Sequence, residues 1–202
     1  FNFAVASRML IGLAICLLLL LIKQQKLNTN KIAISNYIYA GLGVFVTMSL
    51  VYYSSQSIPS GIISVVFGLT PIITGVFALL LLKEPFFKFH KISGLLLGLA
   101  GLVTIFGHTL NVATEMISGL LAVTFAMAFQ SFISVKLKQI NAHISALETT
   151  AGALIISVPL FIISWLLTEG TVPTITLKAA LSIGYLAVFG SVIGFMSYYY
   201  LI

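Results

Sequence analysis

Long apolar runs separated by short polar connections make up almost the whole chain. Seven runs stand out, at residues 2–22, 34–54, 60–82, 92–107, 116–135, 144–167 and 177–202. A helix needs roughly 20 residues to cross a hydrocarbon core about 30 Å thick, so each run has the length of a membrane span. The fourth run is the shortest and requires a nearly upright helix. Strands are excluded, because none of the runs alternates between apolar and polar residues.

Proline and glycine modify two of these predicted helices. Pro71 lies in the middle of the third run and leaves a carbonyl without its helical partner one turn earlier, which predicts a kink. Transporters place such breaks near the membrane midplane, although a kink that serves packing alone is equally compatible. Pro159 is a weaker case of the same kind. In the fourth run, Gly94, Gly98 and Gly101 predict a face for close helix packing.

Composition agrees with this pattern. The chain is 60% hydrophobic and 7% charged, and its mean hydropathy is +1.17. An ordinary soluble domain carries roughly 25% charged residues, so lipid is the solvent of this chain. The net charge of +6 does not indicate nucleic acid as a partner, because the basic residues lie in the connections. A single cysteine, Cys16, excludes an internal disulfide and a cysteine metal site.

Lysines in the connections predict the orientation of the spans. Eight lysines lie in the first, third and fifth connections, whereas the opposite side has one, Lys178, at the outer edge of the last run. Basic loops stay on the cytoplasmic side, so Phe1 starts outside and the protein is a multi-pass protein of the cell (inner or plasma) membrane. The chain begins without methionine and ends inside an apolar run, from which we expect a fragment of a longer protein.

Two of the runs resemble each other. Aligning residues 34–54 with 182–202, an offset of 148, gives five identities in 21 positions. They are Tyr37 with Tyr185, Val44 with Val192, Met48 with Met196, Ser49 with Ser197 and Tyr52 with Tyr200. One copy leaves a lysine-rich connection and the other a lysine-poor one, so the two run antiparallel, as an inverted repeat requires.

Ionisable residues inside apolar runs are functional candidates, because a mid-helix charge costs about 2.5–3.5 kcal/mol on insertion scales. Arg8 would anchor a carboxylate or another anionic group, or its long stem would carry its charge to the outer headgroups. Glu148 would bind a proton or a substrate ammonium, or pair with lysines near His143. For Glu84, pairing with lysines at a helix end is the favoured reading.

Polar and aromatic residues within the spans complete a predicted cavity between two repeats. Tyrosine also gathers at headgroup belts, which is the alternative for the tyrosines. The candidates are Arg8, Ser49, Tyr52, Tyr53, Thr70, Pro71, Thr74, Gln130, Glu148, Ser197 and Tyr200. No phosphate loop, nucleophile pattern or His/Cys cluster is present in the sequence, so we expect no enzyme, no cofactor and no metal site.

The order of these features resembles the EamA-type members of the drug/metabolite transporter superfamily. The resemblance rests on Ala6-Ser7-Arg8, the stretch from Gly61 through Leu69-Thr70-Pro71 to Lys83-Glu84-Pro85, and the glycine-rich helix that follows. It implies an all-α integral membrane protein of ten helices in two inverted five-helix repeats, of which seven are present. Residues 1–107 would then be helices two to five of the first repeat, and residues 116–202 the first three helices of the second.

The resemblance also implies a function. Such proteins export amino acids, other metabolites or drugs by alternating access, so the expected partners are the bilayer and a small-molecule substrate, with a homodimer left open. Two alternatives remain. A seven-helix receptor or retinal protein fits the span count, although Lys178 at the outer edge is the one lysine of the last run. A membrane scaffold without a transport role leaves no mark in a sequence.

Overall fold

A computed structural model describes residues 2–83, 93–94, 97–98, 100–101, 104, 116–140, 142–171, 173 and 175–202. Within these residues every regular element is helical. Six helical segments are long and apolar enough to cross a membrane, and they agree with six of the seven predicted runs. The fourth run, 92–107, lies largely outside the described residues, and so does Glu84.

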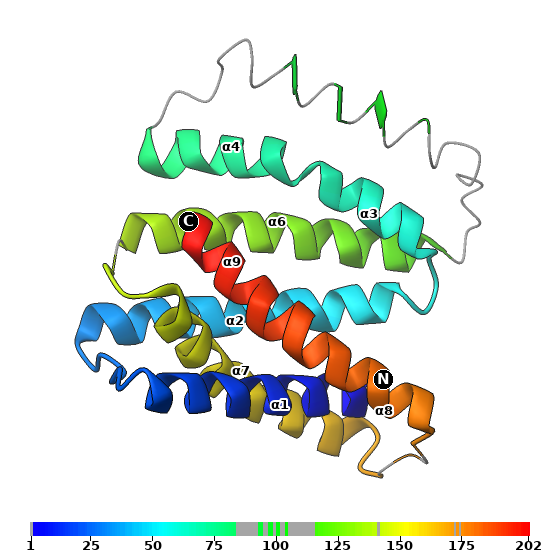
Figure 1. Cartoon of the computed structure of the whole chain (residues 1–202). Coiled ribbons are helices and arrows are strands. Elements are labelled where there is room, and N and C mark those ends of the chain that lie inside the picture. The colour runs from blue at the N-terminus through cyan, green and yellow to red at the C-terminus, as the bar shows by residue number, and fades with distance from the viewer. Residues whose placement is uncertain are drawn as a thin grey trace. The chain divides into compact units, whose positions relative to one another are not determined.

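The six segments comprise nine helical elements, and Figure 1 labels the α-helices among them. The nine elements are α1 (Asn2–Ile22), α2 (Lys31–Ser54), α3 (Ser60–Gly68), α4 (Thr70–Leu82), α6 (Ile117–Ile140), α7 (Ala146–Thr168), α8 (Leu177–Tyr185), η3 (Leu186–Ile193) and α9 (Gly194–Leu201). The chain divides into two compact units, Phe1–Phe45 with Ile140–Ile202, and Val46–Gln139. These units reflect contacts in space rather than sequence repetition, so the repeat boundary between residues 107 and 116 stays a prediction.

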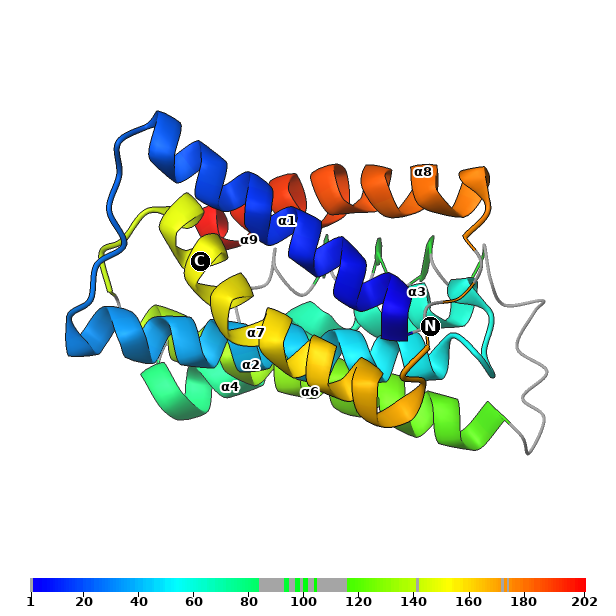
Figure 2. The same ribbon diagram turned by 90° about the horizontal axis from the view of Figure 1, so that it is seen from below.

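In the first unit, α1 and α7 run antiparallel side by side (Figures 1 and 2). A carboxylate joins the two helices at each end. Glu169, after α7, accepts from the backbone N–H groups of Asn2 at 3.2 Å and Phe3 at 3.4 Å at the start of α1. Glu148, near the start of α7, accepts from the N–H of Asn28 beyond the end of α1, at 2.6 Å. The pair is therefore fixed in register.

Two glycines allow α2 to approach α7 closely. A Cβ atom on Gly152 would collide with the ring of Tyr37 in α2. A Cβ atom on Gly41 would lie 2.6 Å from the Cβ of Ile156 in α7. Small residues play this part in membrane helices, where packing replaces the hydrophobic effect as the driving force for association.

The second unit contains the predicted kink. Helix α3 ends at Gly68 and α4 begins at Thr70, with Pro71 in its first turn. The carbonyl of Phe67, four residues before the proline, accepts instead from the Thr70 hydroxyl at 2.5 Å. The Leu69 N–H also bonds to this carbonyl, and the Thr70 hydroxyl is a second donor in place of the N–H that the proline lacks. Pro159, by contrast, lies within α7 without ending it.

Helix α3 packs on α6 within this unit. The buried cluster consists of Ile58, Ile62, Val66, Val123 and Met127. Phe77 of α4 meets Phe132 of α6 edge to face, with ring centroids 5.7 Å apart. At the start of α6, Gly119 lies directly against Ser57, so that a Cβ atom would clash there. These contacts hold the broken α3–α4 segment along α6 (Figure 1).

The last span differs from the plain α-helix that its sequence predicts. Its central turns, Leu186–Ile193, form a π-helix between α8 and α9. The N–H of Gly194 accordingly bonds to the carbonyl of Phe189, five residues earlier rather than four. A π-turn contains one residue more than an α-turn, and such turns occur frequently at functional sites. In this protein the π-helix packs against α1.

Candidate substrate site

Arg8 is a buried cation within an apolar helix. Its side chain is 8% exposed, and its Nε donates to the hydroxyl of Ser191 in η3 at 2.9 Å. A Cβ atom on Gly190 would lie 3.1 Å from Nη2 of Arg8, so the glycine leaves space for the guanidinium. The arginine therefore turns toward a neighbouring helix, whereas the alternative reading placed its charge at the outer headgroups.

Ser191 is fully buried and bridges two residues of α1. Its hydroxyl accepts from Arg8 and donates to the sulfur of Met9 at 3.7 Å. The next turn of α1 carries Gly12, where a Cβ atom would lie 3.2 Å from the Cβ of Ser191. The close approach of α1 to η3 thus fixes both the hydroxyl and the guanidinium bound to it.

Glu148 occupies the first turn of α7. Ser145 caps this helix by accepting from the N–H of Glu148 at 3.1 Å, as in a capping box. One carboxylate oxygen accepts from the Tyr37 hydroxyl at 2.6 Å and from the Asn28 N–H at 2.6 Å. The carboxylate is thus held by a tyrosine and a backbone amide. It lies at the opposite end of the α1–α7 pair from Arg8.

Gln130 forms a second polar contact inside the apolar helices. The hydroxyl of Thr47 in α2 donates to its Oε1 at 3.0 Å. Ser131, the next residue, is buried with no hydrogen-bond partner for its hydroxyl among the described residues. The sequence singled out Gln130 but neither of these neighbours, since threonine and serine are common in membrane helices.

The other predicted site residues are dispersed. Thr70 and Pro71 form the α3–α4 break, and Thr74 is half-buried one turn further on. Ser49 and Tyr52 are half-buried in α2, whereas Tyr53, Ser197 and Tyr200 are exposed, the last at 83%. Tyr52 and Tyr200 belong to different compact units, so a cavity flanked by both stays a prediction.

A pocket of about 370 Å³ lies between the start of α1 and α8. Its walls also include the connection after α7, and Figure 2 shows these segments at the same end of the unit. The lining residues are Phe3, Ala4, Glu169, Thr171, Pro173, Ile175, Ala179 and Ile183. Ala4 precedes Arg8 by four residues, so the two lie on the same face of α1. Arg8 is therefore one helical turn deeper than the pocket.

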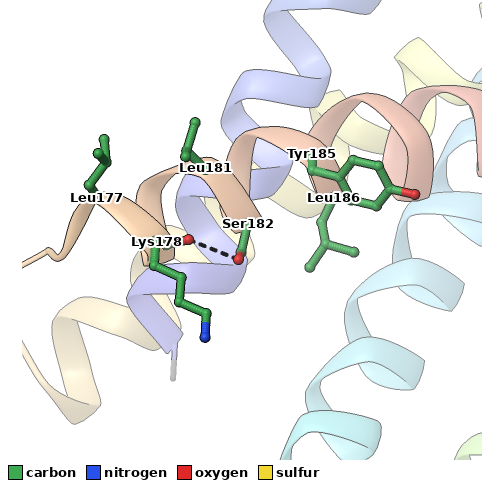
Figure 3. A pocket seen from close by; sticks show the side chains of 6 residues that line it. All are labelled: Leu177, Lys178, Leu181, Ser182, Tyr185 and Leu186. Carbon is green, nitrogen blue, oxygen red and sulfur yellow. Dashed lines mark hydrogen bonds between the residues drawn. The ribbon is translucent and has the colours of Figure 1, made fainter.

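Two open apolar grooves occupy matching places on α8 and α2. The groove on α8, about 590 Å³, is lined by Leu177, Lys178, Leu181, Ser182, Tyr185 and Leu186, and Figure 3 shows the Ser182 hydroxyl donating to the carbonyl of Lys178. The groove on α2, about 490 Å³, is lined by Lys31, Ile34, Ser35, Ile38, Tyr39 and Leu42. Lysine, aliphatic residue and serine thus recur with the same spacing in both helices.

This match gives a second alignment of the two segments, with a gap. Lys31 and Ser35 pair with Lys178 and Ser182 at an offset of 147, not 148. At an offset of 147, residues 31–43 have five identities with the second segment. At an offset of 148, residues 44–54 have four. The gapped alignment therefore has nine identities in 24 positions. The change of offset requires one additional residue in the second copy, and Gly43 matching Gly190 places it at Ser191.

The π-helix accounts for that additional residue, because a π-turn contains one residue more than an α-turn. Two aligned pairs that flank the insertion are buried in both segments: Ala40 and Ala187 are both 0% exposed, and Val44 and Val192 are 4% and 3% exposed. The insertion therefore adds Ser191 while Ala187 and Val192 stay buried. An ungapped comparison missed Ser191, and allowing a gap of one residue would have found it.

Comparisons with known proteins agree with this fold. A solved crystal structure matches the chain with a TM-score of 0.81 at 20% sequence identity, over 98% of this chain and 68% of the other. No curated protein matches. Six apolar helices with polar contacts between them define the class, a multi-pass integral membrane protein. Residues 1–107 match the family model "EamA-like transporter family", and the chain belongs to that family.

Proposed function

We propose that this protein exports small metabolites or amino acids across the cell membrane by alternating access. The observation that carries the proposal is Arg8, a cation buried in an apolar helix and bound to Ser191 of a π-helix. A charge in this place costs about 2.5–3.5 kcal/mol on insertion scales, a cost that packing alone does not require. Membership of the EamA-like transporter family supports the same function.

The proposed architecture is a ten-helix bundle made of two inverted repeats, divided between residues 107 and 116. Two observations support it. The gapped match relates α2 to the α8–η3–α9 segment, and the chain corresponds to 68% of a longer protein with the same fold. In this architecture the substrate cavity lies between the repeats, and the bilayer covers the apolar faces of the outer helices.

Transport is favoured over catalysis and over a scaffold role. In the part of the chain that the structure describes, no group of three His, Cys, Asp or Glu side chains is placed to hold a metal. Arg8 and Glu148 lie at opposite ends of the α1–α7 pair instead of sharing one reaction centre. A scaffold, moreover, gives no reason to keep a charge inside an apolar helix. Charges and hydroxyls distributed along the helices fit a translocation route.

The test is flux through the purified full-length protein. Liposomes containing the protein would be loaded with a defined mixture of amino acids and organic acids, and mass spectrometry would follow what leaves. We expect a small subset to leave faster than from protein-free liposomes, and to leave faster still when the same compound is supplied outside, because exchange is typical of carriers. Equal loss from both liposome types for every compound would contradict the proposed function.

A further inference from the structure

We propose that Arg8, positioned by Ser191, recognises an anionic group of the substrate, with a carboxylate as the best fit. This inference rests on the proposed transport function and names the substrate class for it. A guanidinium is planar and matches a carboxylate with two parallel hydrogen bonds. The bond from Nε to Ser191 fixes the plane of the guanidinium, so Ser191 is a positioning residue.

The first argument is that the protein adds a residue at this contact. In α2, the other copy of the repeat, no residue corresponds to Ser191, and the helix is α-helical throughout. In the second copy the inserted residue is the one that bonds to Arg8. π-turns are rare and occur frequently at functional sites. The insertion supplies an acceptor for the arginine.

The second argument is that the position of Arg8 recurs in α7. At an offset of 140, residues 6–22 and 146–162 share five identities, among them Gly12 with Gly152. This alignment pairs Arg8 with Glu148. The two helices are antiparallel, so the paired positions lie toward opposite ends of the unit.

The contacts around the two positions also correspond. Arg8 bonds to Ser191, whose Cβ lies against Gly12 four residues further along α1. Glu148 bonds to Tyr37, whose ring lies against Gly152 four residues further along α7. In each proposed repeat, an ionisable side chain thus bonds to a hydroxyl of the neighbouring helix. The residue that carries the hydroxyl packs against a glycine four residues further along the helix of the ionisable side chain. The two positions differ in the residue that supplies the hydroxyl, serine against tyrosine, and in the charge, which is positive at the predicted outer end.

The pocket between α1 and α8 lies one helical turn before Arg8 on the same face of α1, at the predicted outer end of the span. The Arg8 side chain itself extends to Ser191 of η3 and does not line the pocket. Glu169 in the pocket wall has its carboxylate bonded to two backbone N–H groups of α1. Arg8 is the basic residue of α1, and it follows the pocket by one helical turn.

The experiment measures ligand binding to the full-length protein in nanodiscs of phosphatidylcholine. Four probes separate charge from shape: succinate, its neutral diamide, 1,4-diaminobutane and inorganic phosphate. We expect succinate to raise the unfolding temperature, phosphate to do so more weakly, and the diamide and the diamine to have no effect. Arg8→Gln should weaken succinate binding about 10- to 100-fold, the effect of losing a charge-assisted hydrogen bond.

Further variants keep the test valid if Arg8→Gln does not fold. Ser191→Ala keeps the charge but releases the guanidinium, and Gly190→Ala places a Cβ atom 3.1 Å from Nη2. Both should weaken succinate binding about tenfold and reduce the preference for succinate over phosphate, which a merely structural role would not change. Lys178→Gln removes one positive charge at the exposed start of α8 and should bind succinate like the unmodified protein.

Three results would overturn the inference. The first is no preference for anions in the unmodified protein, and the second is an unchanged preference in the Arg8 and Ser191 variants. The third is loss of succinate binding when phosphatidylglycerol is added, which would identify a lipid headgroup as the ligand. The inference and the proposed function fail separately. Anion binding without flux would contradict transport alone, and flux that is indifferent to the charge at Arg8 would contradict the anion site alone.

Discussion

Gly152→Ala tests the packing of α2 on α7. In an isolated helix this change stabilises by about 0.5–1 kcal/mol, because glycine loses more backbone entropy than alanine on folding. At Gly152 the added methyl group would collide with the ring of Tyr37, and overpacking of this kind costs about 1–3 kcal/mol. Gly184→Ala in α8 is the matched control, because a Cβ atom there meets nothing within 4 Å. The two variants should therefore differ by about 1–3 kcal/mol, with Gly152→Ala the less stable.

The assay is unfolding of the full-length protein in mixed micelles with increasing sodium dodecyl sulfate. Trp165 lies in α7, the helix that carries Gly152, so its fluorescence reports on this helix directly. It meets Phe3 edge to face with ring centroids 5.4 Å apart, and separation of α1 from α7 would change its surroundings. If Gly152→Ala were as stable as Gly184→Ala, α2 and α7 would not approach as closely as the structure shows.

Two further substitutions test hydrogen bonds in the same assay. Tyr37→Phe removes the hydroxyl that donates to Glu148 and should cost about 1.5–3 kcal/mol, as for other hydrogen bonds to charged groups, whereas Tyr39→Phe on the open face of α2 should cost little. Equal stability of the two variants would show that the bond contributes nothing. Thr70→Val removes the hydroxyl that donates to the Phe67 carbonyl in place of the N–H that Pro71 lacks, and should cost about 1–3 kcal/mol. In a Pro71→Ala background the backbone N–H returns, so the cost of Thr70→Val should nearly vanish, and a cost that persists would refute this role of the hydroxyl.

The sequence was sufficient to predict the six spans that the structure describes and the break at Pro71. Both follow from local rules, the length of an apolar run and the missing N–H of proline, which do not depend on distant residues. The hydroxyl that donates in place of the proline N–H was harder to predict. A threonine before a proline is common, and only the structure shows the Thr70 hydroxyl at the Phe67 carbonyl.

The site was harder to predict, because its contacts join residues far apart in the chain. Arg8 and Glu148 stood out as charges in apolar surroundings, but nothing local indicates that Ser191 and Tyr37 are their partners. The π-helix was hidden for another reason. A one-residue insertion changes the offset of a repeat, so an ungapped comparison retained the later matches and lost the earlier ones.

The most direct test of the central claim is export from living cells. Cells without the full-length gene would be compared with cells that regain either the unmodified gene or the Arg8→Gln form, after loading with a broad set of metabolites. We predict that a few anionic metabolites stay inside the deletion cells, leave again with the unmodified protein, and stay inside with Arg8→Gln although that protein reaches the membrane. Unchanged export of every metabolite in the deletion cells would contradict the account.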